Sequence, residues 1–176
     1  MQVGDSLEQL VSTLQQALRD ADAVLLTGGV SMGNFDFVPA AVQNAGLTTV
    51  FHKLPIRPGR PILGGVSSDG QLVLGLPGNP VSAAVGGLRF AIPLLAKMGG
   101  AISDYSPKPR VTVATPHTRS LPLHCFRLVR VHPDGYVDWV SSQGSGDLVS
   151  LAHSDGFVEV PKNETGTGPW SYWSWH

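Results

Sequence analysis

Charge and cysteine are the scarcest features of this 176-residue chain. Only 14% of its residues are charged, whereas about 25% is usual in globular proteins, and 12 Lys and Arg nearly balance 13 Asp and Glu. The resulting net charge of −1 gives no electrostatic footprint for nucleic acid or for an anionic membrane. The single cysteine, Cys125, excludes an internal disulfide and a multi-cysteine zinc site.

Signals for export and for membrane insertion are also missing. The first residues show no basic segment followed by an apolar one, so no signal peptide is predicted. The most apolar stretch, Phe90 to Met98, is too short to span a bilayer and contains Pro93 and Lys97. We therefore expect a cytoplasmic protein with neither nucleic acid nor a membrane as partner.

Glycine and proline, in contrast, are abundant. The 21 glycines and 14 prolines make up about a fifth of the chain, against an average of about 12%. They follow no collagen period, so they must serve turns. With 42% hydrophobic residues and little charge, the composition argues against disorder.

Apolar spacing predicts alternating helices and strands in the first hundred residues. Helices are expected at 7–18, 37–44 and 81–98, the last with a possible kink at Pro93, and strands at 23–26, 47–51, 61–65 and 71–76. This alternation predicts an α/β fold with a partial three-layer, mostly parallel sheet.

The pattern changes after Gly99-Gly100 to short β-like runs. They cover 110–114, 124–131, 136–140 and 157–160, with a Pro133-Asp134-Gly135 turn. We predict an α/β domain at 1–104, a linker at 103–108 and a small all-β barrel or sandwich at 107–176. The tryptophans of the C-terminal tail, Trp170, Trp173 and Trp175, are expected to pack on that second domain.

A glycine-rich cluster, Thr27 to Asp36, follows the first predicted strand. Such a turn at a helix start lets backbone N–H groups converge on an anion, and Ser31 adds a donor. Asp36 could hold Mg²⁺ or a polar ring edge. The alternative is a tight turn with Asp36 as the N-cap of the next helix, and on this cluster alone the two interpretations are equally good.

A basic cluster comes next, with Lys53, Arg57 and Arg60 around the turn residues Pro58 and Gly59. Guanidinium groups bind phosphate or other oxyanions in a bidentate manner, and lysine acts as a point charge. A solvated basic loop is the alternative.

The third cluster, Gly75 to Ser82, again joins an apolar strand to a helix start. Gly78 permits close backbone approach, and Pro80 suits the first helical turn. Taken alone, this cluster indicates a well-formed helix start. Ligands bind beyond the carboxyl ends of strands in open α/β sheets, so the three clusters together predict one binding crevice. The six histidines show no metal-ligand spacing, and structural or surface roles are expected for them.

Taken in order, the three loops resemble the MoeA family, the molybdopterin molybdotransferases, which includes the E domain of gephyrin. The carrying segments are Thr27 to Asp36, Arg57 to Pro61 and Leu76 to Ser82. The stretch Gln143 to Gly146, with the β runs around it, resembles that family's C-terminal β-barrel domain. The resemblance covers nearly all of this chain but only the C-terminal half of the family's chain.

The resemblance implies insertion of molybdenum from molybdate into adenylylated molybdopterin, with release of AMP and a need for Mg²⁺. The residues it implies as catalytic are Asp36, Lys53, Arg57 and Arg60, with Asp36 also the metal ligand. Ligand contacts are implied for Gly28, Gly29, Ser31, Gly33, Pro58, Gly59, Pro77, Gly78, Asn79, Pro80 and Ser82. The alternative is a catalytically incomplete remnant that binds a pterin or nucleotide or acts as a scaffold. A homodimer, or pairing with a chain that supplies the missing half, is the expected assembly.

Overall fold

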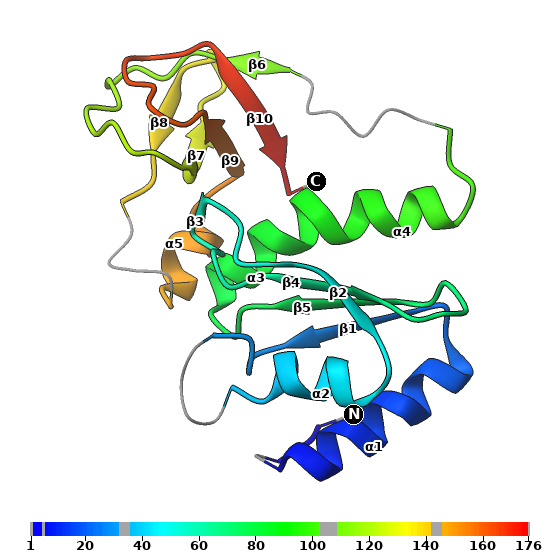
Figure 1. Ribbon diagram of the computed structural model, residues 1–176. Helices are drawn as coiled ribbons and strands as arrows, with labels where there is room; N and C mark the ends of the chain where they lie inside the picture. The colour runs from blue at the N-terminus through cyan, green and yellow to red at the C-terminus, as the bar shows by residue number, and fades with distance from the viewer. Residues whose placement is uncertain (1, 5, 32–35, 103–108, 142–145, 176) are drawn as a thin grey trace. The chain divides into compact units, whose positions relative to one another are not determined.

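The computed structural model describes residues 2–4, 6–31, 36–102, 109–141 and 146–175 (Figure 1). The predicted linker, 103–108, lies outside the described residues. Contacts group the chain into two compact units. The first comprises Met1–Leu54 and Gly59–Gly86, and the second comprises Pro55–Pro58 and Gly87–His176. The domain boundaries given above, 1–104 and 107–176, stay a prediction.

The first unit contains three helices and four strands among its described residues. They are α1 (Leu7–Asp20), β1 (Ala23–Thr27), α2 (Val38–Asn44), β2 (Thr48–His52), β4 (Leu63–Val66), β5 (Leu72–Leu76) and α3 (Pro80–Gly86). Each lies within a few residues of the segment that apolar spacing predicts. Helix α1 begins after Ser6, whose side chain accepts a hydrogen bond from the Gln9 amide.

The sheet of this unit has the strand order β1-β5-β4-β2. Strands β1 and β5 are parallel, while β4 is antiparallel to both β5 and β2. Strands β1, β5 and β2 therefore run in one direction, and β4 runs in the opposite direction. The sheet predicted to be mostly parallel is thus a mixed sheet. The reason is local: the short turn around Gly70, with a φ of 86°, joins β4 to β5 as a hairpin.

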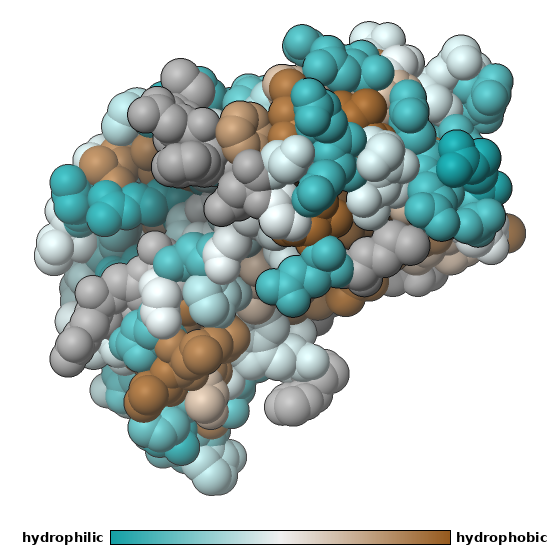
Figure 2. Space-filling view, turned by 90° about the horizontal axis from the view of Figure 1, so that it is seen from below, coloured by the Kyte–Doolittle hydropathy of each residue, from teal (hydrophilic) through white to brown (hydrophobic). Residues whose placement is uncertain are grey.

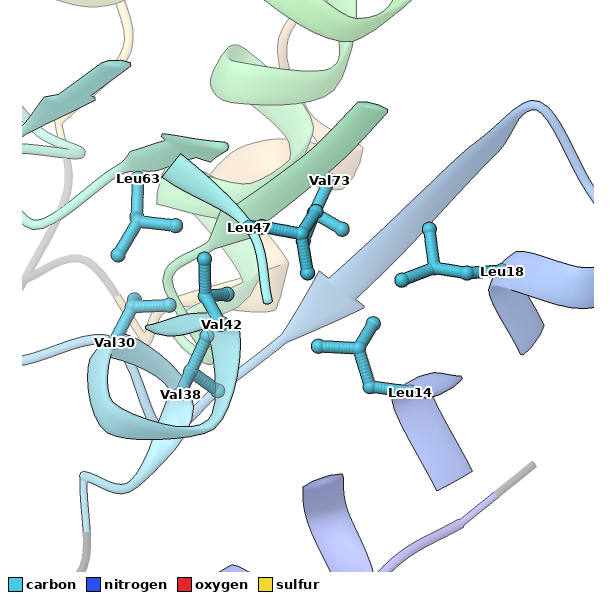
Figure 3. Packing of buried hydrophobic residues seen from close by; sticks show 8 residues of the cluster. All are labelled: Leu14, Leu18, Val30, Val38, Val42, Leu47, Leu63 and Val73. Carbon is cyan, nitrogen blue, oxygen red and sulfur yellow. The ribbon is translucent and has the colours of Figure 1, made fainter. Parts of the chain in front are cut away.

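Helices cover both faces of this sheet, as Figure 1 shows. Helices α1 and α2 pack on one face, where buried side chains form the core drawn in Figure 3. These are Leu14, Leu18, Val30, Val38, Val42, Leu47, Leu63 and Val73. Helix α3 lies on the opposite face (Figure 1). It packs closely on β5, since a Cβ on Gly86 would lie 2.9 Å from Leu76 Cδ2. The α/β class and the three-layer arrangement are thus confirmed.

The predicted helix at 81–98 consists of three consecutive segments. Helix α3 is followed by a π-helical turn, η1 (Gly87–Ala91), and by α4 (Ile92–Met98). Pro93 lies in the first turn of α4, where its missing N–H costs nothing, and the wider turn directly precedes it. The run Pro80–Met98 is long and apolar enough to cross a membrane by length and composition alone, a test that core helices of globular proteins also pass.

The second unit contains one six-stranded sheet among its described residues. Its strands are β3 (Ile56–Arg57), β6 (Arg110–Val111), β7 (His124–Val131), β8 (Val137–Trp139), β9 (Gly156–Val160) and β10 (Trp170–Ser174). The order is β3-β7-β9-β10-β6, with β8 also on β7. One backbone hydrogen bond of 3.0 Å, from Ala114 N to the Val137 carbonyl, links the segment after β6 to β8.

This half differs from the predicted all-β barrel in two respects. No ladder joins β6 to β3 or to β8 among the described residues, and the chain of this unit also forms a short helix, α5 (Leu148–Ala152). Its core combines Cys125, Val129 and Val158 with Trp170. Trp170 and Trp173 are 2% and 7% exposed, so the tryptophan tail does pack on this unit, as a paired strand.

Apolar side chains also remain on the surface. Val50 is 66% exposed, and Ile92 is 49% exposed. On the face drawn in Figure 2, apolar residues occur as separate groups among hydrophilic ones. Scattered apolar surface of this kind is normal for a globular protein.

Candidate functional site

The glycine-rich loop and the loop after β5 meet at the ends of two parallel strands. Thr27 and Leu76 are partners in the β1–β5 ladder, and the Gly28 amide donates to the Leu76 carbonyl at 3.0 Å. A Cβ on Gly78 would lie 3.1 Å from Gly28 Cα, closer than side chains normally approach. Glycine at both positions therefore lets the two backbones touch.

Positive φ angles turn the chain sharply away from β1. They are 88° at Gly28 and 65° at Gly29, a region that only glycine enters freely. The Val38 amide then donates to the Gly29 carbonyl at 3.0 Å, which fixes the start of α2 against the loop. Ser31 is exposed at this point, whereas Gly33 lies outside the described residues.

Asp36 is half-buried and immediately precedes the start of α2. The N-cap position of this helix is occupied by Phe37, which makes no side-chain capping bond. The alternative interpretation of Asp36 as the N-cap is therefore wrong. The ligand role of Asp36 stays a prediction.

The basic cluster is divided between the two units. Lys53 and Arg60 belong to the first unit and are exposed, whereas Arg57 and Pro58 belong to the second. The Lys53 amide donates to the Ile62 carbonyl at 3.0 Å, so Lys53 lies beside the start of β4. Arg57 instead pairs with Cys125 of β7. The Leu54 amide donates to the Arg60 carbonyl at 3.0 Å, so the backbone at Arg60 lies close to the segment that follows β2.

The end of β2 is tied directly to the glycine-rich loop. His52 Nε2 lies 3.0 Å from the Val30 carbonyl oxygen, across 22 residues of sequence. Because β2, β5 and β1 run in the same direction, their carboxyl ends lie at one edge of the sheet. His52 is a residue that sequence reasoning passed over, because no spacing or motif signals this contact.

The third cluster forms the start of α3. The Asn79 side-chain oxygen accepts from the Ser82 amide at 3.3 Å and from the Ser82 hydroxyl at 3.4 Å. Pro80 is the first residue of the helix, as expected. Pro77 and Ser82 are buried and Gly78 is exposed, so Gly78 is the member of this cluster that faces solvent most openly.

The second unit holds polar clusters with no sequence signal. Glu159 accepts from Arg89 at 3.0 Å and lies 3.1 Å from His124 Nδ1, beside a hollow that Arg110 also lines. Elsewhere Arg127 contacts His117. Burial lowers the pKa of Arg127 and, with the Arg127 charge, that of His117, while burial raises the pKa of the Cys125 thiol.

Metal ligands are sparse in the part of the chain that is described. No three His, Cys, Asp or Glu side chains group together there. Mg²⁺ is, however, commonly held by one or two carboxylates with substrate phosphates and water. Asp36, next to the glycine-rich loop, fits that mode and does not fit an all-protein metal cage.

Family comparisons match both parts of the chain. Residues 1–97 match the family described as "Probable molybdopterin binding domain", and residues 110–169 match "MoeA C-terminal region (domain IV)". The first match alone covers more than half of the chain.

Curated proteins named molybdopterin molybdenumtransferase are also similar to this chain. The molybdopterin molybdenumtransferase of Synechococcus elongatus is 39% identical over 165 residues, and that of Staphylococcus epidermidis is 28% identical over 173 residues. Each alignment covers 92% of this chain but only 40% and 39% of the relative.

Solved structures extend the comparison to the fold. A molybdopterin biosynthesis MoeA protein from Pyrococcus horikoshii superimposes with a TM-score of 0.79 at 24% identity, over 98% of this chain and 42% of that one. A molybdenum cofactor biosynthesis protein from Pyrococcus furiosus gives a TM-score of 0.71 at 29% identity, over 97% and 56%. The chain therefore spans about 40% of the curated relatives' length.

Proposed function

Because this chain belongs to the MoeA family, with a molybdopterin-binding domain followed by the MoeA C-terminal region, we propose that it acts in molybdenum cofactor biosynthesis. The proposed reaction is insertion of molybdenum from molybdate into adenylylated molybdopterin, with release of AMP. A cytoplasmic location and assembly with a second copy, or with a chain carrying the rest of the relatives' length, belong to the same proposal.

The contact between the glycine-rich loop and the loop after β5 carries this proposal. Two positive-φ glycines and the exposed Gly78 leave backbone open at the carboxyl ends of β1 and β5, where ligands of α/β sheets bind. Phosphate and molybdate are tetrahedral oxyanions that accept hydrogen bonds from backbone N–H groups and from Ser31. Lys53 and Arg60 add positive charge at the same sheet edge, and Arg57 completes the proposed set.

Asp36 is the proposed Mg²⁺ ligand, together with phosphate oxygens of the bound nucleotide. The ion would supply Lewis-acid stabilisation of charge on the phosphoanhydride. The chain's own residues have the tasks of binding and orientation: Gly28, Gly29 and Gly33 in one loop and Pro77 to Ser82 in the other enclose the ligand, with Pro58 and Gly59 shaping the basic turn.

A binding module without turnover is the second candidate. Calorimetry with adenylylated molybdopterin, and with AMP plus molybdate, separates the candidates when followed by a molybdenum-insertion assay. Binding with turnover supports the first, and binding without turnover selects the second. Absence of binding in every titration would overturn both.

Replacing Asp36 tests the metal role. We expect Asp36→Ala to abolish the Mg²⁺-dependent part of the affinity for AMP, because the only proposed protein ligand is removed. We expect the circular dichroism spectrum to stay unchanged, because the side chain is only half-buried. Asp69→Ala, in an exposed turn, is the matched control and should behave as the parent. Unchanged Mg²⁺ dependence in Asp36→Ala would show that the assignment is wrong.

A further inference from the structure

The hydrogen bond of His52 fixes the tautomer of its ring. The Val30 carbonyl can only accept, so Nε2, at 3.0 Å, must carry the proton and donate. His52 is half-buried at the last position of β2.

Val30, whose carbonyl accepts this hydrogen bond, belongs to the glycine-rich loop. Its side chain is 1% exposed and lies in the core, where a Cβ on Gly75 would come within 2.7 Å of it. Core packing holds the side chain of Val30, and His52 holds its carbonyl. The backbone between Gly28 and Ser31 is thereby fixed from both sides, at the place where its N–H groups would meet an anion.

Lys53 follows His52 directly and takes an unusual backbone conformation. Its φ is 68°, in the left-handed region that non-glycine residues rarely enter. Its amide is bonded to the Ile62 carbonyl, which keeps this turn closed. His52 thus contacts the glycine-rich loop, and the neighbouring Lys53 begins the basic loop, residues 53–60.

We propose that His52 is a positioning residue that couples the glycine-rich loop to the basic loop and sets the spacing of the anion-binding groups. The inference rests on the proposed function for its consequence in ligand binding, but the coupling itself is independent of any ligand. In this role His52 acts on the ligand indirectly, through Val30 and through the start of the Lys53 turn.

Two variants separate the hydrogen bond from the bulk of the ring. His52→Phe keeps a ring and removes the donor, whereas His52→Gln places an amide N–H where Nε2 lies. Amide exchange followed by NMR on the full chain reports the loop, because the Gly28 and Val38 amides are hydrogen-bonded at its two ends. The Leu72 amide, bonded to the Asp22 carbonyl at the opposite end of β5, is the control remote from the loop.

We expect His52→Phe to accelerate exchange at Gly28 and Val38 about fivefold, as loss of one net hydrogen bond predicts, without change at Leu72. His52→Gln should restore the parent rates. Calorimetry with AMP plus molybdate should show weaker binding in His52→Phe and recovery in His52→Gln.

The outcomes separate the two proposals. Equal exchange in the parent and His52→Phe would overturn the coupling, and so would faster exchange that His52→Gln does not restore. Faster exchange with undiminished affinity would overturn the positioning role. If neither the parent nor the variants bind AMP plus molybdate while the exchange pattern holds, the proposed function fails for this probe and the coupling stands.

Discussion

At the scale of single residues, a contact with Arg127 determines whether the ring of His117 is charged. The side chain is 6% exposed, and Arg127 Nη1 lies 3.0 Å from its Nδ1. A guanidinium can only donate, so Nδ1 accepts, the ring is neutral and the proton is on Nε2. That buried Nε2 has no hydrogen-bond partner among the described residues, and the ring makes edge-to-face contacts with Trp139 and Trp170.

This environment predicts a pH dependence of stability. Burial, followed by the charge of Arg127, lowers the pKa of His117 below its ordinary value of about 6.5. Between the folded pKa and about 6.5 the unfolded chain binds a proton that the folded chain does not, so the unfolding free energy should fall as the pH drops through that window. Urea unfolding at a series of pH values from 7 to 5 measures it.

His117→Asn is the variant that isolates this contribution. The asparagine oxygen can accept from Arg127 in place of Nδ1, and the side chain does not titrate. We expect a flatter dependence of the unfolding free energy on pH in this range. His153→Asn, at an exposed position, should retain the parent slope. An unaltered slope in His117→Asn would contradict the assignment.

At the scale of elements, the start of α3 depends on one capping side chain. Asn79 accepts two hydrogen bonds from Ser82, whose side chain is 4% exposed. Asn79→Ala should lower the unfolding free energy by about 1 kcal/mol, the usual value of a helix cap. Asn79→Ser keeps a capping oxygen and should stay close to the parent in urea unfolding. Equal stability of the alanine variant and the parent would show that the cap contributes nothing.

Elements with strong local signals were predictable from the sequence, and those that depend on partners were not. Leucines at helical spacing indicate α1, and the predicted β-like run His124 to Val131 coincides with β7. Strand β3 has two residues and exists only through pairing with β7, so nothing local signals it. The tryptophan tail was expected to pack, but its pairing with β9 as β10 depends on residues distant in the sequence.

At the scale of the whole molecule, each unit has its own hydrophobic cluster. Val42 is fully buried in the first and Val129 in the second. Truncating either valine to alanine should cost about 2 kcal/mol through lost burial and a cavity.

The effect should appear first in the unit that carries the substitution. Val129→Ala should accelerate amide exchange in β7 and β9 more than in β1 and β5, and Val42→Ala should do the reverse. Hydrogen exchange measured by mass spectrometry resolves these segments. The same acceleration in all four strands from either variant would show that the two clusters open as one.

The candidate site was predictable in its residue types and only partly in its arrangement. Glycine, proline and arginine clusters mark loops that can approach anions, and two of these loops do meet at the sheet edge. The assignment of Arg57 to the other unit and the contact of His52 with Val30 follow from strand pairing, which spacing along the chain does not encode.

The sequence by itself determined where the chain turns, where helices start and which family the chain belongs to. The turns and the helix starts follow from local sterics: only glycine enters the φ of Gly28 and Gly29 freely, and proline fits the first turn of α3. The tertiary structure decided which loops touch, which way β4 runs and which histidines are bound. These depend on burial and hydrogen bonds between residues far apart in the chain, and no local pattern carries that information.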